Sequence, residues 1–432
     1  MRVILVSYHF PPDPAVGSLR PQSVAAALAA QGHTVVVVTA RLPGETGEWR
    51  TRADGIRVRI VQPLPGPREL WAQIKSRRRT TGSTSETVAA TEGDVARRSV
   101  PTWKRYLYSF IWLPDDRQGF IPPAAWAASM LVREGVDLIY TSAPPFSTHL
   151  VGLLLRTFRG IRWVAEFRDP WTDNPWKPDA FKSAASLSIE RWLESRTLAL
   201  AARTVSVTDG IHRQLSAKVS PSARSRFLVV RNGIQRVLPP RAEGPAPQPF
   251  RILYIGTFYL NRDPTPFLQA LARVRRRHDL GPQQLAVTFV GHCRQFDERR
   301  IDREVSDLGL DDVVSFRDWV PHDTALELIR ESDLLLLLAR GQPTQVPNKL
   351  YEYLGTRIPI LASVDENGES AVMLREIGGH YVMEAEEPAL IERAIEQAMT
   401  LAPGRPGTPD EALLEEWRTS VQMQRLLSAI ET

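Results

Sequence analysis

The sequence predicts an α/β protein with two doubly wound, Rossmann-like domains. Short apolar runs alternate with amphipathic segments along most of the 432 residues, and this alternation is typical of parallel strands connected by helices. It is interrupted once, at residues 236–249, by a stretch that holds five prolines and has no apolar period. Proline stiffens a chain and interrupts regular structure, so we interpret this stretch as a linker with one domain on each side.

The first domain is expected to cover residues 1–235. Its apolar runs predict strands at 3–6, 34–39, 56–61, 137–141, 162–167, 204–207 and 227–230. Helical periodicity lies between most of them, at about 19–31, 122–134, 147–158, 183–202 and 209–218. A polar, Ser/Thr-rich insert at about 76–100 has no such period, and we expect it to be a mobile loop.

The second domain is expected to cover residues 250–410. Strands are predicted at 252–255, 285–290, 313–316, 334–338 and 358–362. Helices are predicted at 264–277, 297–307, 322–331, 348–354, 369–376 and 388–400. Residues 411–432 are predicted to form a final helix, and its apolar residues make it a candidate for crossing back onto the first domain.

The composition is that of a soluble globular protein, with 43% hydrophobic and 24% charged residues. The single cysteine, Cys293, excludes an intramolecular disulfide. No apolar run approaches the ~18 residues of a membrane span, so a cytoplasmic location is expected. Neither an Asp-x-Asp motif nor a histidine pair at metal-binding spacing occurs, and we therefore expect no metal in the site and no cofactor.

The most informative motif is the stretch 346–355, between the apolar runs 334–338 and 358–362. This order predicts a strand, a loop, a short helix and a parallel strand, and open α/β sheets bind ligands at the carboxyl ends of such strands. Lys349 and Glu352 stand three residues apart on the short helix. Only six of the 54 basic residues are lysines, so a lysine here stands out from the composition. A cation at this position suits phosphates and a carboxylate suits two sugar hydroxyls, while a solvated lysine and a surface carboxylate are the alternatives.

The loop after the first strand runs from Ser7 to Arg20 and contains Pro11-Pro12 and Gly17. It lacks the G-x-G-x-x-G of dinucleotide-binding proteins, which makes a dehydrogenase a distant alternative. Its pattern resembles the opening of glycosyltransferases with the GT-B fold, family GT4. In that family the glycine loop lies against the donor phosphates or the acceptor, and a loop without side chains lets backbone amides approach an anion.

Further motifs extend the resemblance along nearly the whole chain. They are 141–149, 166–171, 230–234, 254–257, 313–321 and 347–355, the last of which resembles the donor-site helix of the branch that makes bacterial surface polysaccharides and natural products. The resemblance implies two Rossmann-like domains that face each other across a cleft. It also implies transfer of a sugar from a nucleotide-diphosphate sugar with retention at the anomeric carbon.

The resemblance assigns roles to residues of the second domain and to Gly17 of the first. Lys349 and Arg262 are expected to hold the diphosphate, and Glu352 the ribose hydroxyls. The remaining expected donor-binding residues are Gly17, Gly256, Thr257, Trp319, Val320, Thr344 and Asn348. Trp319 and Val320 flank the base. Thr344 stands where the family has the first of two glutamates, and Thr257 where many members have a basic residue.

In the first domain, Arg168 and Asp169 are expected in the cleft, orienting the acceptor hydroxyl or the donor sugar. A buried ion pair at the end of a strand is the alternative for these two residues. For His149, a role in the cleft and a role in core packing are equal alternatives.

The resemblance favours UDP as the nucleotide, with GDP next. The acceptor is a lipid-linked saccharide, a glycan or a small natural product. The aromatic and basic segment 103–113 suggests peripheral contact with the inner face of a membrane. Because Thr344 replaces a usual functional residue, a non-catalytic relative that binds a nucleotide sugar stays open, as does a GT-B enzyme of altered chemistry.

Overall fold

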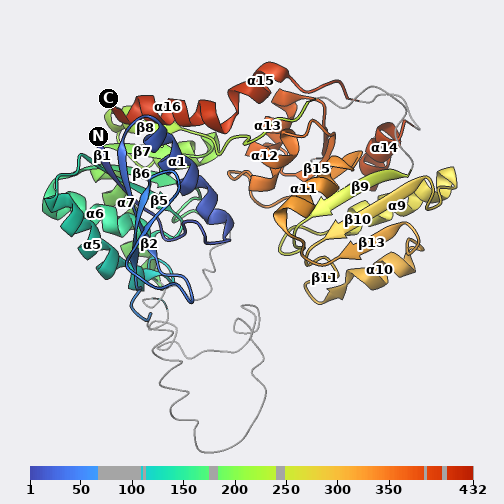
Figure 1. Ribbon diagram of the computed structural model, residues 1–432. Helices are drawn as coiled ribbons and strands as arrows, with labels where there is room; N and C mark the ends of the chain where they lie inside the picture. Colours follow the sequence, from blue (N-terminus) through green and yellow to red (C-terminus); the bar gives the residue numbers. More distant parts are fainter. Residues whose placement is uncertain are drawn as a thin grey trace, which may run out of the picture. The chain divides into compact units, whose positions relative to one another are not determined.

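The computed structural model describes residues 1–66, 109, 113–174, 183–239, 249–383, 387–400 and 406–431. The chain divides into two compact units, Met1–Val230 with Met423–Thr432, and Arg231–Gln422. Each unit contains one large sheet with helices on both faces (Figure 1). The α/β class with two Rossmann-like units is thereby confirmed. The insert expected at 76–100 lies outside the described residues.

The sheet of the first unit has the order β3-β4-β2-β1-β5-β6-β7-β8. Only β3 runs antiparallel, against β4. The strands are β1 (Arg2–Val6), β2 (Thr34–Ala40), β3 (Trp49–Thr51), β4 (Arg57–Val61), β5 (Leu138–Ala143), β6 (Arg162–Phe167), β7 (Arg203–Ser206) and β8 (Phe227–Val229). The strand order reverses between β1 and β5, and open α/β sheets bind ligands at the carboxyl ends of the strands at such a point.

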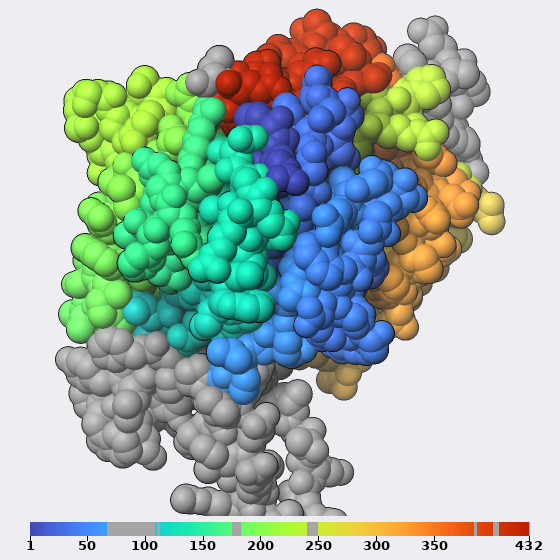
Figure 2. All heavy atoms as spheres, turned by 60° about the vertical axis from the view of Figure 1, so that its left-hand side comes forward, coloured from blue at the N-terminus to red at the C-terminus, as the bar shows by residue number. Residues whose placement is uncertain are grey.

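Helices cover both faces of this sheet. The core on one face includes residues of α5 (Ile121–Arg133), α6 (Ser147–Arg159), α7 (Ala184–Leu200) and α8 (Asp209–Ser216). The core on the other face includes residues of α1 (Leu19–Ala30) and α16 (Thr419–Glu431). Short 3-10 turns lie at Val16–Ser18, Gln118–Phe120 and Pro221–Arg226. Figure 2 turns the face with α5 and α6 towards the viewer.

The sheet of the second unit has the order β13-β10-β9-β14-β15-β16, and all of its pairs are parallel. The strands are β9 (Phe250–Ile255), β10 (Leu285–Val290), β13 (Val314–Arg317), β14 (Leu334–Ala339), β15 (Ile360–Val364) and β16 (Tyr381–Met383). The helices are α9 (Thr265–His278), α10 (Ile301–Asp307), α11 (His322–Arg330), α12 (Asn348–Leu354), α13 (Glu369–Ile377), α14 (Pro388–Ala398) and α15 (Glu411–Glu416).

Two predicted helices differ from the structure. The segment 297–307 begins as a hairpin of β11 (Gln295–Phe296) and β12 (Arg299–Arg300), which turns at Asp297 with φ 51°, and only then becomes α10. The helix predicted at 411–432 is broken into α15 and α16. The backbone of Ile234 explains the break, because its amide donates to Trp417 O (2.7 Å) and its carbonyl accepts from Thr419 N (3.0 Å).

The last helix belongs to both units, since the division between them falls after Gln422. Beyond that point Met423, Leu426, Leu427 and Ile430 are buried in a core of the first unit. Within the described part of the chain, no helix combines the length and apolarity needed to cross a membrane.

Candidate functional site

The carboxyl ends of β9 and β10 meet through two glycines. Gly256 follows β9 with φ 150°, and Gly291 follows β10 with φ 107°, a backbone region that L side chains rarely adopt. A Cβ on Gly291 would lie 2.3 Å from Gly256 O, and one on Gly256 would lie 2.8 Å from Lys349 Nζ. The glycines therefore allow two loops and a lysine to share a space that side chains would fill.

Lys349 lies in the first turn of α12 and reaches across to β9. Its Nζ donates to Ile255 O (3.0 Å) and lies 4.3 Å from the centre of the Tyr254 ring. Burial, followed by the charge of Arg262, lowers the pKa of Lys349 to about 7, although Cys293 and Glu352 oppose the shift. Removing water from an ammonium group without supplying a carboxylate partner makes it a ready receptor for an anion.

Two further charged side chains stand near this lysine. The Arg262 guanidinium stacks on the Tyr259 ring at 4.4 Å, and among the described residues no hydrogen-bond acceptor engages it. Glu352 is half-buried on α12, and its carboxylate has no hydrogen-bond donor in the same part of the chain. Burial raises the pKa of Glu352 against the opposing charges of His322 and Lys349. Both groups can bind a ligand without first breaking an ion pair.

The loop after β14 is held by one carboxylate. Asp365, just after β15, accepts hydrogen bonds from the amides of Gly341 (2.9 Å) and Gln342 (2.8 Å). Thr344 lies half-buried in this loop, which leads into α12. The sequence predictions of a strand, a loop and a short helix at 334–354 are thus confirmed.

The other residues expected at the donor are spread around the same sheet edge. Thr257 O accepts from Tyr254 OH (3.1 Å), and Asn348 is half-buried as the first residue of α12. Trp319 follows β13 and is 74% exposed, whereas Val320 packs against the core. An exposed tryptophan at a strand end offers a flat surface on which a base can stack.

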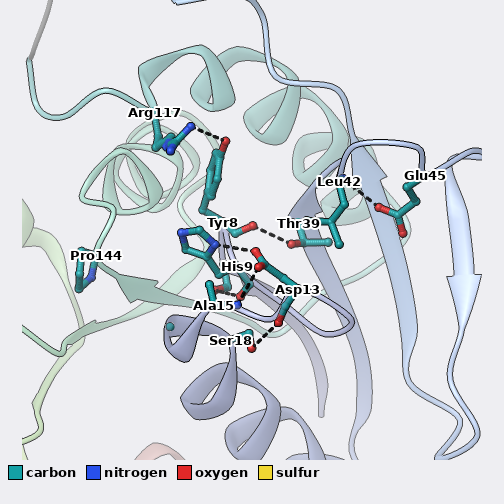
Figure 3. A network of polar contacts seen from close by, with 12 residues as sticks. Tyr8, His9, Asp13, Ala15, Ser18, Thr39, Leu42, Glu45, Arg117 and Pro144 are labelled. Carbon is teal, nitrogen blue, oxygen red and sulfur yellow. Dashed lines mark hydrogen bonds and ion pairs between the residues drawn. The ribbon is translucent and has the colours of Figure 1, made fainter. Parts of the chain in front are cut away.

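In the first unit, an Asp-centred network fixes the loop after β1 (Figure 3). The carboxylate of Asp13 pairs with His9 Nδ1 (2.6 Å) and accepts from Ala15 N (2.9 Å). The Ser18 hydroxyl donates to Asp13 O (2.9 Å). This network holds the short turn that contains Gly17. The sequence analysis missed the His9–Asp13 pair, because a spacing of four residues brings side chains together on a helix, whereas this segment is a loop that contains Pro11 and Pro12.

Arg168, directly after β6, joins the loops that follow β1 and β5. Its guanidinium donates to Gly17 O (2.6 Å) and Ala143 O (3.3 Å), and also to Pro144 O. Burial lowers the pKa of Arg168, while the charges of Glu166 and Asp169 oppose this shift. Three carbonyl acceptors explain how a guanidinium is held here, and they place Arg168 beside Gly17. Asp169 is half-buried next to it.

His149 lies in the core of the first unit. Its Nδ1 is 2.8 Å from Thr141 Oγ1, its ring is 4.4 Å from that of Phe167, and its Nε2 has no partner among the described residues. Burial, with the charge of Arg168, lowers the pKa of His149 to about 3. The imidazole is therefore neutral and is separated from solvent.

A buried ion pair escaped the sequence analysis. Arg20 Nε donates to Glu166 Oε1 (2.8 Å), and Ser142 Oγ donates to Glu166 Oε2 (2.7 Å). Although burial raises the pKa of Glu166, Arg20 and Ser142 outweigh it and hold that pKa below its usual range. Arg20 also donates to Val230 O (3.0 Å). The pair thus connects α1, β5, β6 and the residue that follows β8.

The structure brings the expected residues together in two groups. Lys349, Arg262 and Gly256 lie together in the second unit, with Glu352 near the lysine. Gly17 and Arg168 lie together in the first unit. Within the described residues, no group of three His, Cys, Asp or Glu side chains is arranged to hold a metal ion.

Comparison with known proteins identifies relatives of the same architecture. The family model "Glycosyl transferase 4-like domain" matches residues 18–233. Sucrose-phosphate synthase from Thermosynechococcus elongatus is 14% identical, with a TM-score of 0.58 over 99% of this chain and 94% of that one. No curated protein matches the sequence.

Two further solved structures are similar over the full chain. HepE from Anabaena, in complex with UDP, is 13% identical, with a TM-score of 0.60 over 100% of both chains. The lipopolysaccharide outer core galactosyltransferase WaaB is 12% identical, with a TM-score of 0.59 over 100% of this chain and 99% of that one. Because the family model covers half of the sequence and the fold is shared along its length, this chain belongs to the GT4-like glycosyltransferases with the GT-B fold.

Proposed function

We propose that the protein transfers a sugar from a nucleotide-diphosphate sugar to an acceptor hydroxyl, with retention at the anomeric carbon. The observation that carries the proposal is the Lys349 ammonium, held against Ile255 O without a carboxylate partner and with Arg262 nearby. A departing diphosphate gains negative charge in the transition state. Cations fixed beforehand at that point stabilise the transition state more than the bound donor.

The donor is proposed to be a UDP-sugar. HepE, which shares the fold, has been solved with UDP and with UDP-glucose. Glu352, whose carboxylate is half-buried and open to a donor, would accept hydrogen bonds from the ribose hydroxyls. Trp319 and Val320 would flank the base. Thr257, Thr344 and Asn348 would contact the phosphates or the donor sugar.

On the acceptor side, the Gly17 loop and the Arg168–Asp169 turn would orient the attacking hydroxyl. His149 is left out of the groups that touch substrate, because it is buried in the core. The acceptor would be a lipid-linked saccharide, a glycan or a small natural product. We propose a reaction without a metal ion, so that chelation with EDTA would leave the rate unchanged. The membrane contact expected for 103–113 lies outside the described residues, apart from 109 and 113.

Thermal unfolding with UDP, GDP, ADP, CMP and NAD tests the donor site. A ligand at a hundred times its Kd should add about 2.7 kcal/mol to the free energy of unfolding. We expect a shift with UDP that Lys349→Met abolishes and Arg276→Ala preserves. Arg276 is the matched control, an exposed cation on α9 of the same unit. The absence of a shift with any nucleoside diphosphate would overturn the donor site, and a shift with NAD would favour a dehydrogenase.

Turnover is tested separately, by following consumption of UDP-sugars in the presence of candidate acceptors, with and without EDTA. The anomeric configuration of the product, read by NMR coupling constants, tests retention. UDP-sugar binding without consumption for any acceptor class would favour the non-catalytic relative that Thr344 suggests.

A further inference from the structure

Three helices of the first unit expose an unusual number of large apolar side chains. Among the most exposed are Phe158 (76%), Trp126 (64%) and Trp192 (59%). Such side chains occur singly on most protein surfaces, but a contiguous group marks a site of interaction. The exposed members on these helices are Trp126 and Met130 of α5, Leu154 and Phe158 of α6, and Ile189 and Trp192 of α7. We call these six residues the apolar face.

The six residues lie on three helices that are neighbours. α5 contacts α6, and α6 contacts α7, and α5 and α6 reach the surface on the side that Figure 2 turns forward. At the carboxyl end of α6, the Arg159 guanidinium donates two hydrogen bonds to Ser129 Oγ of α5 (3.0 and 2.8 Å). Phe158 and Met130 each stand one residue from this contact. Trp126 and Met130 are four residues apart on α5, and Leu154 and Phe158 are four residues apart on α6. Each pair therefore lies on one side of its helix.

The exposed charges carried by these three helices have a single sign, and the nearest exposed carboxylate along the chain is that of Glu134, directly after α5. Within α5, α6 and α7, all of whose residues the structure describes, the acidic residues are Glu190 and Glu194, and both are buried. The exposed charges of these helices are those of four arginines, Arg133, Arg159, Arg191 and Arg196. The three helices that carry the apolar face therefore expose four cations and no carboxylate of their own.

We propose that the apolar face is a docking surface for an anionic phospholipid membrane. Tryptophan and phenylalanine rings favour the boundary between headgroups and acyl chains, where their apolar bodies leave water. Arginine extends its aliphatic stem along the apolar surface while its guanidinium stays with the headgroup phosphates. Each basic residue near an anionic membrane increases the partition about fivefold, so four of them complement the contact of the rings.

The charge pattern also argues against a second copy of the chain as the occupant. In a two-fold symmetric dimer the same surface meets itself, which would bring arginines towards arginines without neutralising carboxylates on these helices. An anionic lipid surface neutralises them instead. The proposal is independent of the transferase activity, because docking is measured without donor or acceptor.

Co-sedimentation of the full chain with vesicles tests the proposal. Vesicles of phosphatidylcholine with phosphatidylglycerol are compared with vesicles of phosphatidylcholine alone. We expect binding to the anionic vesicles only, with a blue shift of tryptophan emission. The triple variant Trp126→Ala/Phe158→Ala/Trp192→Ala and the double variant Arg191→Glu/Arg196→Glu should each lower the partition at least tenfold.

Two matched controls should bind as the wild type does. Trp49→Ala removes an exposed tryptophan from β3 of the same unit, and Arg276→Glu reverses an exposed charge in the other unit. Because the changed side chains are exposed, all variants should keep the wild-type melting temperature.

Absence of wild-type binding would overturn the proposal. Undiminished binding of the triple variant would also overturn it and would assign the membrane contact to another segment, such as 103–113. Concentration-dependent dimerisation that the triple variant abolishes, without vesicle binding by the wild type, would replace the lipid by a second copy.

Discussion

Lys349 shows how burial tunes a single residue for an anionic ligand. Its pKa is lowered to about 7 by burial and by Arg262, against the ordinary value of about 10.4 in an unfolded chain. Keeping Lys349 protonated therefore destabilises the folded protein, and a bound diphosphate would offset this destabilisation. The sequence indicated this residue through the scarcity of lysine, but it could not show that its partner is a carbonyl rather than a carboxylate.

The titration of Lys349 should appear in the stability of the free protein. Between its folded and unfolded pKa values, the unfolded chain binds more protons at this position, so the stability of the wild type rises with pH from about 7 to about 10. Below pH 7 the full penalty is present. Compared with Lys349→Met, the wild type should thus gain stability across this range, as measured by urea unfolding at a series of pH values. Parallel pH profiles for the two proteins would contradict the prediction.

The same titration should accompany ligand binding. At pH 8.5 UDP is fully ionised and the free lysine is largely neutral, so binding should take up protons as the ammonium is restored. Calorimetry in buffers of different ionisation enthalpy measures this uptake. Arg276→Ala should leave it unchanged, and a proton uptake of zero in the wild type would contradict the role of Lys349.

Between elements, the buried Arg20–Glu166 pair connects α1 to the sheet. Removing one partner of a buried ion pair leaves the other charge uncompensated, at a cost of about 3–5 kcal/mol. We expect Arg20→Met to lower the free energy of unfolding by this amount, and Arg20→Met/Glu166→Leu by less than the sum of the single changes. Urea unfolding measures all three.

The pair Arg52–Asp54 of the same unit, in which Arg52 is half-buried and Asp54 exposed, provides the matched control. Because solvent screens it, Arg52→Met should cost about 0–1 kcal/mol. Equal costs for Arg20→Met and Arg52→Met would refute the structural importance of the buried pair.

The elements that the sequence predicted well are the buried parallel strands, because a short unbroken apolar run such as 334–338 is compatible with few other structures. The sequence analysis missed β3 and β16, which are three residues long and lie at sheet edges, where periodicity has little room to appear. The break between α15 and α16 could not be predicted either. It depends on hydrogen bonds to Ile234 (2.7 and 3.0 Å), a residue almost two hundred positions earlier.

At the scale of the whole molecule, the second half of α16 is part of the core of the first unit. Leu426 is fully buried there, so Leu426→Ala should lower the free energy of unfolding of that unit by about 2–5 kcal/mol. Gln424→Ala, at an exposed position of the same helix, should change it by less than about 0.5 kcal/mol. Calorimetry that resolves the two units measures both, and similar effects of the two substitutions would contradict the prediction.

The path of the chain also has a consequence for its biosynthesis. The chain leaves the first unit after Val230 and returns to it at Met423. The last segment of the first unit is therefore synthesised after every residue of the second unit. Domains in simple succession usually fold in the order of their translation. Here the second unit can fold first, while a core of the first unit waits for Met423, Leu426, Leu427 and Ile430 to emerge. The other apolar residues of that core, Val24 and Leu28 among them, lack these four partners until then, and they are the residues to which a chaperone could bind on the nascent chain.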